Sequence, residues 1–167
     1  MANLLQTERL IFRDWTLADV DAFHLICADE RVMRFVGAGQ PWSRDATERF
    51  ISDAIKMLAA HDYCQWALVH KVDARLIGYC GFVPAAEGIE IGWRLATQYW
   101  GQGLASEAAR IGLTYGFETL GCERIIATIQ TANRASIRLA KKLGMTPESH
   151  FVRDGRSVIV YSAHSRR

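Results

Sequence analysis

The stretch Gln98-Tyr-Trp-Gly101-Gln102-Gly103-Leu-Ala-Ser-Glu107 decides how this chain is interpreted. A short apolar run precedes it, and an apolar-rich helical pattern follows from Ala105 to Thr119, so the glycines lie at a strand-to-helix turn. Such a turn directs backbone N–H groups and the positive end of the helix dipole at whatever lies above the helix start. Because glycine has no Cβ, a ligand can approach the backbone closely, and we expect a cradle for a phosphate or pyrophosphate.

Three kinds of phosphate-binding loop place glycines at such a turn. A nucleoside-triphosphate loop needs Lys followed by Ser or Thr after its last glycine, and Leu104 stands there instead. A dinucleotide loop could use Ser106 as its third small residue, but its acidic residue should end the next strand, and Glu123 precedes that strand. The acyl-coenzyme A pattern, Gln/Arg-x-x-Gly-x-Gly/Ala, fits residues 98–103 at every fixed position. A plain loop with two glycines is the remaining alternative.

Composition indicates an ordinary globular chain and excludes several classes of protein. The chain has 167 residues, of which 50% are hydrophobic and 23% charged, and its formal net charge is +2. These values predict a single domain over residues 1–167 and no general affinity for nucleic acid. No apolar run is long enough to span a membrane, and no signal-peptide pattern opens the chain. The cysteines lack zinc-site spacing, so we expect reduced thiols in a cytoplasmic protein without a metal.

The first sixty residues predict one strand and three helices. Glu8–Trp15 alternates in hydrophobicity as a strand does, and Thr16 can begin a helix. Asp29–Phe35 predicts a second, short helix. Ser43 is a plausible N-cap for a third helix over residues 44–60.

Residues in the middle of the chain change to a period of two, which predicts three strands at Tyr63–His70, Leu76–Pro84 and Gly88–Leu95. Their connections are short, so the three strands should form an antiparallel meander. Gly78 and Gly81 lie inside the second of these strands. Glycine inside a strand indicates either a close approach of two backbones or a bulge.

The last third of the chain predicts a strand, a helix and a hairpin. Arg124–Thr131 is rich in β-branched residues, and a strand, a helix and then a strand suggest parallel pairing through a right-handed crossover. Asn133 should cap the following helix at its start and Gly144 at its end. Residues 146–151 and 157–163 then predict the closing hairpin.

This order of elements resembles the GNAT acetyltransferase family along nearly the whole chain. The resemblance implies an α/β fold with a mixed, mostly antiparallel sheet flanked by helices. Three stretches carry it, namely residues 7–13 (TERLIFR), residues 100–108 (WGQGLASEA), and Asn133-x-x-Ser136 followed by residues 142–145 (KLGM). Each resembles the branch that acetylates the N-termini of ribosomal proteins, with Met145 where Phe is commoner. Together they are more specific for the fold than for the substrate.

The resemblance also implies acetyl-coenzyme A as co-substrate and a set of residues that bind it. In the family, the strand before the turn splays from its parallel neighbour and offers its backbone to the pantetheine arm, through residues that match Ile91, Gly92 and Trp93. Amides of the turn would hold the pyrophosphate, and the residues concerned are Gln98, Gly101, Gln102, Gly103 and Leu104. Asn133 matches an asparagine that contacts the coenzyme, although its use as a helix N-cap is a strong alternative.

Ser136 and Glu90 are the expected catalytic residues. Attack of an amine on a thioester expels a thiolate, and the Ser136 hydroxyl could hydrogen-bond or protonate that sulfur. Many family members use Tyr for this, but none follows Ser136 in this helix. Glu90 lies beside the expected splay and could act as a base through water; His70, His150 and Glu148 are weaker candidates. The alternative for Ser136 is a small helix residue that serves only in packing. The alternative for Glu90 is an exposed carboxylate on a strand without a catalytic role.

The expected reaction is direct acetyl transfer to a primary amine, most readily the α-amine of a protein N-terminus, as the branch resemblance suggests. An α-amine has a pKa of about 8 and an alkyl ammonium of about 10, so the α-amine needs less help from a base. A small-molecule amine, such as a polyamine, an amino acid or an aminoglycoside, is the first alternative. A non-catalytic coenzyme A-binding domain is the second, and a nicotinamide enzyme the third. Dimers are common in the family, so a homodimer is one expected assembly.

Overall fold

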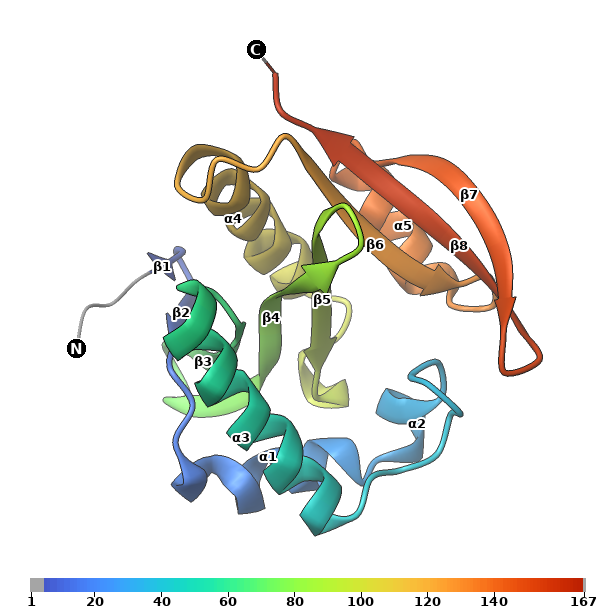
Figure 1. Ribbon diagram of the computed structural model, residues 1–167. Coiled ribbons are helices and arrows are strands. Elements are labelled where there is room, and N and C mark those ends of the chain that lie inside the picture. Colours follow the sequence, from blue (N-terminus) through green and yellow to red (C-terminus); the bar gives the residue numbers. More distant parts are fainter. Residues whose placement is uncertain (1–4, 167) are drawn as a thin grey trace.

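The computed structural model describes residues 5–166, which form an eight-stranded sheet with helices on both faces (Figure 1). The strands are β1 (Leu5–Gln6), β2 (Leu10–Arg13), β3 (Gln65–His70), β4 (Arg75–Ala85), β5 (Gly88–Leu95), β6 (Arg124–Gln130), β7 (Thr146–Arg153) and β8 (Arg156–His164). The α-helices are α1 (Val20–Cys27), α2 (Glu30–Met33), α3 (Arg44–His61), α4 (Leu104–Glu118) and α5 (Arg134–Lys142). The strand order is β1-β2-β3-β4-β5-β6-β8-β7, and the β5–β6 pair is parallel. This mixed, mostly antiparallel arrangement confirms the expected fold class.

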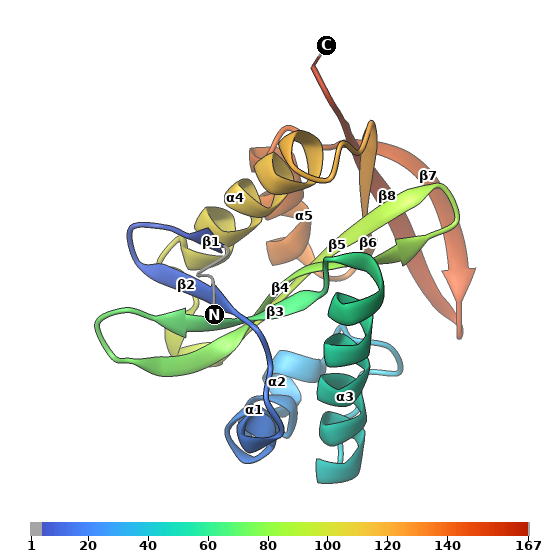
Figure 2. The ribbon, with the colours of Figure 1, turned by 60° about the vertical axis from the view of Figure 1, so that its left-hand side comes forward.

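Two helical layers enclose the sheet. Figure 2 shows α4 and α5 on one face and α1, α2 and α3 on the other. The largest fully buried side chains between these layers include Trp66, Phe12, Phe82 and Ile91. Burial of each such side chain stabilises the folded state by about 1.5–3 kcal/mol. None of the helices between residues 5 and 166 is long and apolar enough to cross a membrane.

The predicted meander of three antiparallel strands is confirmed by the pairing of β3 with β4 and of β4 with β5. Its central strand needs glycine at position 78. A Cβ added to Gly78 would lie 1.8 Å from the carbonyl oxygen of Arg94 on β5, a distance that no side chain tolerates. The register of β3 against β4 also shifts between Leu68 and Val69. Both expected features, the close backbone approach and the irregularity, are therefore present in this part of the sheet.

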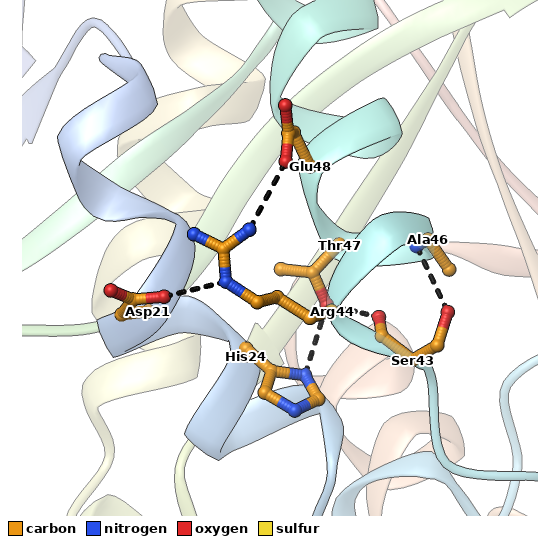
Figure 3. Close-up of polar contacts among 7 residues, drawn as sticks. All are labelled: Asp21, His24, Ser43, Arg44, Ala46, Thr47 and Glu48. Atoms are coloured by element: carbon orange, nitrogen blue, oxygen red, sulfur yellow. Dashed lines mark hydrogen bonds and ion pairs between the residues drawn. The ribbon is translucent and has the colours of Figure 1, made fainter.

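Polar contacts hold the start of α3 against α1 (Figure 3). The Ser43 hydroxyl accepts a hydrogen bond from the Ala46 N–H at 3.1 Å, which confirms the predicted N-cap. The Arg44 guanidinium lies between Asp21 of α1 and Glu48 of α3, at 2.8 and 3.2 Å. These exposed ion pairs contribute little stability, but they fix the position of the loop that leads into α3.

The structure departs from the prediction in two details, one in the C-terminal third and one near the start of the described residues. Helix α5 ends with Leu143 as its C-cap, and Gly144 follows with a φ of 81°, so the glycine is the residue after the cap and not the cap itself. Strand β1 was not predicted, because two residues are too few to show an alternating pattern. The turn between β7 and β8 is as expected, with Asp154 and Gly155 at φ values of 51° and 73°.

The four cysteines are free, and Cys122 is the one that is partly exposed, which confirms the expectation of mostly buried, unpaired thiols. Burial raises the pKa of the Cys64 and Cys80 thiols to about 12. Neither thiol is therefore ionised near neutral pH. Across the described residues, no group of three or more His, Cys, Asp or Glu side chains could hold a metal ion.

Strands β5 and β6 pair over two residues only and then diverge. The paired residues are Ile89 with Ile125 and Glu90 with Ile126. Beyond that point β6 continues to pair with β8 along its whole length, and Figure 1 shows it turning away from β5. The backbone of β5 after Glu90 therefore has a free edge on this side, and the sheet opens at the place where the sequence predicts a splay.

Candidate active site

A cleft of about 590 Å³ opens where β5 and β6 diverge. Its walls come from five segments: α2 with the loop after it, the end of β5, the glycine turn, the start of α4, and α5. Helices α4 and α5 cover one face of the sheet and α2 covers the other (Figure 2). Segments from both sides of the sheet therefore contribute to the lining of the cleft.

The structure brings part of the predicted site together in this cleft. The predicted residues that line it are Trp93, Gly101, Gly103, Leu104, Asn133 and Ser136. They come from β5, the turn and α5, which lie far apart in the sequence.

The other predicted residues lie beside the cleft and outside its lining. They are Ile91, Gly92, Gln98, Gln102 and Glu90. The Ile91 side chain is buried in the core, so only its backbone is available to a ligand. The roles predicted for these residues, apart from that of Glu90, depend on backbone groups and not on side chains that project into the cleft.

The glycine turn leaves open space above the start of α4. Gly101 and Gly103 have φ values of 70° and 77°, a left-handed conformation that favours glycine. A Cβ added to Gly101 would meet nothing within 4 Å, and one added to Gly103 would meet only the Arg9 guanidinium at 3.6 Å. The first N–H groups of α4 also lack acceptors within the helix. The turn can therefore receive a phosphate group, and a side chain at either glycine would occupy the same space.

A partly buried network ties this turn to the segment between β1 and β2. The Glu107 carboxylate accepts hydrogen bonds from the Thr7 hydroxyl, from the Arg9 backbone N–H at 2.9 Å and from the Arg9 guanidinium at 2.7 Å. Burial alone would raise the pKa of Glu107, but these hydrogen bonds outweigh burial and lower the pKa below its usual value. The Arg9 guanidinium also donates to the Gln102 carbonyl at 2.9 Å. Because that peptide unit is planar and trans, the Gly103 N–H points away from Arg9.

The Ser136 hydroxyl lies on α5 and accepts a hydrogen bond from Nε1 of Trp93 at 3.2 Å. The indole is a donor only, so the Ser136 hydroxyl keeps its own hydrogen for another acceptor in the cleft. The Asn133 side-chain oxygen accepts the Ser136 backbone N–H at 3.2 Å, which confirms the expected N-cap. The Asn133 amide hydrogens remain available, so capping does not prevent contact with a ligand.

Glu90 has a partner that the sequence does not indicate. Its carboxylate accepts a hydrogen bond from the Thr128 backbone N–H on β6 at 3.1 Å. The side chain thus bridges β5 and β6 directly at the point where they separate. This contact gives Glu90 a structural role at the edge of the opening, and its role as a base stays a prediction.

The weaker candidates for a base also lie outside the cleft lining. Glu148 forms an ion pair with Arg124 at 2.6 Å, and the hydrogen bond from Arg124 lowers the pKa of that carboxyl group. His70 lies on β3 beside Asp73, at 3.0 Å, and His150 is exposed on β7. The lining as described contains no Asp, Glu or His side chain.

The charged side chains that line the cleft are all cationic. They are Arg31, Arg34, Arg94, Arg138 and Lys142. Arg138 and Lys142 are four residues apart and share one side of α5, where they suit the phosphates of a coenzyme. The predicted site residues include none of these five cations.

Comparison with known proteins identifies the family. The model of the acetyltransferase (GNAT) domain matches residues 9–146. The uncharacterized N-acetyltransferase YoaA of Bacillus subtilis (strain 168) is 31% identical over 89% of this chain and 85% of its own length. Spermidine N(1)-acetyltransferase of Escherichia coli (strain K12) is 28% identical over 81% of this chain and 72% of its own length.

Solved structures show the same fold. A GNAT-family acetyltransferase from Bacillus anthracis superposes with a TM-score of 0.84 and 28% identity, over 95% of this chain and 96% of that chain. The RimL ribosomal L7/L12 alpha-N-protein acetyltransferase, solved in complex with coenzyme A, superposes with a TM-score of 0.81 and 18% identity, over 95% of each chain. At that identity the second likeness concerns the fold alone.

Replacement of Gly103 by valine tests the phosphate cradle. In Gly103→Val the branched side chain fills the space above the start of α4, and we expect acetyl-coenzyme A binding to weaken by about tenfold or more in calorimetric titration. The matched control is Gly121→Val, because Gly121 also has a left-handed φ, of 67°, and open space around it. Gly121 follows the far end of α4, roughly 22 Å from the turn. Equal affinity of wild type and Gly103→Val would contradict the cradle.

Proposed function

The chain belongs to the GNAT acetyltransferase family, and on this premise we propose that its acceptor is the α-amine at the N-terminus of a protein or peptide. The chain is an acetyl-coenzyme A-dependent N-acetyltransferase, as its family domain and its relatives show. The finer proposal concerns only the acceptor. Three sequence stretches that resemble the ribosomal-protein branch support it.

The observation that carries this proposal is the absence of a base from the described cleft lining, where no Asp, Glu or His side chain occurs. An amine must be neutral to attack a thioester. Near pH 7.4 about a fifth of an α-amine with a pKa of about 8 is neutral, whereas well under about 1% of an alkyl amine with a pKa of about 10 is neutral. A cleft without its own base therefore suits an α-amine better than the side chain of lysine or a polyamine.

The free edge of β5 and the glycine turn are the proposed site for the coenzyme. Backbone groups of Ile91, Gly92 and Trp93 are not paired with β6, so they can hydrogen-bond to the amide groups of a pantetheine arm. The amides from Gln98 to Leu104 face the pyrophosphate, and the Asn133 amide contacts the arm. This assignment places the coenzyme on the side of α4 and α5 and leaves the side of α2 for the acceptor.

In the proposed reaction the neutral amine attacks the thioester carbonyl carbon, and the carbon–sulfur bond breaks with its electron pair on sulfur. The Ser136 hydroxyl donates its hydrogen to the departing thiolate and regains a proton from solvent water, and the Trp93 N–H stabilises the negative charge that develops on the serine oxygen in between. Water takes the proton that the amine releases. Glu90, which lies outside the cleft lining, is the proposed final acceptor for that proton through water after the attack, so the amine must still arrive neutral without its help.

A small-molecule amine is the second candidate acceptor, because spermidine N(1)-acetyltransferase is among the relatives. The charges of the cleft argue against a polyamine here. Its charged lining residues are all cationic, and they would repel a polycation as it approaches.

The acceptor class can be tested with a peptide that has a free N-terminus and one internal lysine. We expect acetylation of the N-terminal amine and not of the lysine, with mass spectrometry of fragments as the readout. The kcat/KM profile should follow the pKa of the acceptor itself, rising through a pKa of about 8 for a peptide and about 10 for an alkyl amine. Preferential acetylation of the lysine, or a profile that does not move with the acceptor, would contradict the proposal.

Substitution of Ser136 tests its role as proton donor. In Ser136→Ala we expect kcat for a peptide acceptor to fall by about tenfold to a hundredfold, because the thiolate leaves unprotonated. Acetyl-coenzyme A affinity should stay within about threefold of wild type, since the serine acts on the leaving group. Ser149→Ala on the exposed strand β7 is the control. A Ser136→Ala enzyme with wild-type kcat would exclude this role.

A further inference from the structure

Arg94 is a buried cation for which the fold supplies no negative charge. The residue is 6% exposed, and its Nε atom is buried without a hydrogen-bond partner. No carboxylate between residues 5 and 166 forms an ion pair with it. Its Nη1 donates to the Cys27 sulfur at 3.2 Å, and burial raises the pKa of that thiol even beside a cation. The thiol is therefore neutral and cannot balance the charge.

Aromatic rings hold the Arg94 guanidinium in place. It lies 4.4 Å from the centroid of Trp42 and 5.1 Å from that of Tyr79, with Phe23 and Phe50 each at 5.9 Å. Cation–π contacts offset part of the cost of burying the charge, and an arginine cannot escape that cost by losing its proton. The rings orient the group and leave it with Nε and Nη2 free of hydrogen bonds to the described residues. Two adjacent N–H donors of this kind match the two oxygens of a carboxylate.

Arg94 lies on the acceptor side of the cleft. Successive side chains of a strand point to opposite faces. Trp93 contacts Ser136 of α5, whereas Arg94 contacts Cys27 of α1 and the aromatic rings beneath α3. Arg94 also lines the cleft, on the face of β5 opposite that of Trp93.

The α2 wall adds positive charge to the same side. Arg34 lines the cleft, lies 5.2 Å over the Phe35 ring, and forms no ion pair with the described residues. Arg31 also lines it, but Asp29 neutralises that side chain at 2.7 Å. The proposed site for the coenzyme phosphates lies on the opposite side of the cleft, where Arg138 and Lys142 line it. The cations of β5 and α2 are therefore left for the acceptor.

We propose that the acceptor carries a carboxylate within a few bonds of the amine that is acetylated, and that Arg94 selects the acceptor by binding this carboxylate. The inference rests on the proposed function, because it assumes that an amine enters from the α2 side. Two sources supply this chemistry: the side chain of an acidic N-terminal residue, and the α-carboxylate of a free amino acid. In both, the carboxylate provides the negative charge that the described residues of the protein do not place beside Arg94.

The test compares acceptors that differ only by carboxylate and carboxamide. One arm uses Asp-Ala-Ala-amide against Asn-Ala-Ala-amide, and the other uses alanine against alanine amide, with kcat/KM measured at saturating acetyl-coenzyme A. In at least one of the two comparisons, we expect the wild-type kcat/KM for the carboxylate acceptor to exceed that for the matched carboxamide by about tenfold or more. A preference in the first arm identifies an acidic N-terminal residue, and a preference in the second identifies a free amino acid. Equal rates within both arms would overturn the proposal.

Variants assign the preference to Arg94. In Arg94→Met the ratio of kcat/KM for the carboxylate acceptor to kcat/KM for the carboxamide should fall to about one. Arg94→Lys should retain part of the wild-type preference for the carboxylate. Arg110→Met, on the exposed surface of α4, should keep the wild-type ratio. Because a ratio cancels a general loss of activity, a purely structural role of Arg94 would leave it unchanged. An Arg94→Met enzyme that keeps the preference would overturn the proposal.

A binding measurement keeps the proposal testable if turnover is absent. We expect N-acetyl-Asp-Ala-Ala-amide or N-acetylalanine, added with coenzyme A, to raise the Tm of the wild type more than the matched carboxamide does. The difference should vanish in Arg94→Met. The absence of an acid-specific shift in the wild type would overturn the carboxylate inference, whereas a failure to acetylate any peptide N-terminus would overturn only the proposed acceptor class.

Discussion

The two-residue parallel pairing of β5 with β6 is the constraint on which the site depends. After Ile89 and Glu90 the two strands separate, while β6 stays paired with β8 along its other edge. Separation leaves a row of backbone donors and acceptors on β5 exposed to the cleft, and these groups must find partners. The carboxylate of Glu90 satisfies the Thr128 N–H at the edge of the opening. A ligand with amide groups is the natural partner for the rest.

The glycine turn depends on a contact across the fold. Arg9 and Glu107 are 98 positions apart, and their hydrogen bonds join the two stretches of sequence that most resemble the family. Arg9 also donates to the Gln102 carbonyl, so the segment between β1 and β2 contacts the glycine turn directly. A substitution in either stretch would therefore disturb coenzyme binding, even though Arg9 lies outside the described lining of the cleft.

Local patterns in the sequence predicted most of the fold and about half of the site. Caps such as Ser43 and Asn133, the Asp154-Gly155 turn and the glycines at 101 and 103 are fixed by neighbouring residues, so one sequence reveals them. The partner of Glu90 depends on the register of a parallel pair, which no local pattern encodes. The environment of Arg94 is assembled from three elements, and its charge looked like that of any strand residue until Trp42 and Cys27 were placed beside it.

The central claim is that acetyl-coenzyme A occupies the opening between β5 and β6, and amide chemical shifts in a 15N-labelled protein test it most directly. On addition of acetyl-coenzyme A, the account predicts the largest shifts at the amides of residues 91–95 and 98–104 and at Asn133 and Ser136. The amide chemical shifts of the β7–β8 turn should not change. Shifts confined to other surfaces, such as the pocket between Leu25 and Thr97, or no shifts at all, would contradict the account.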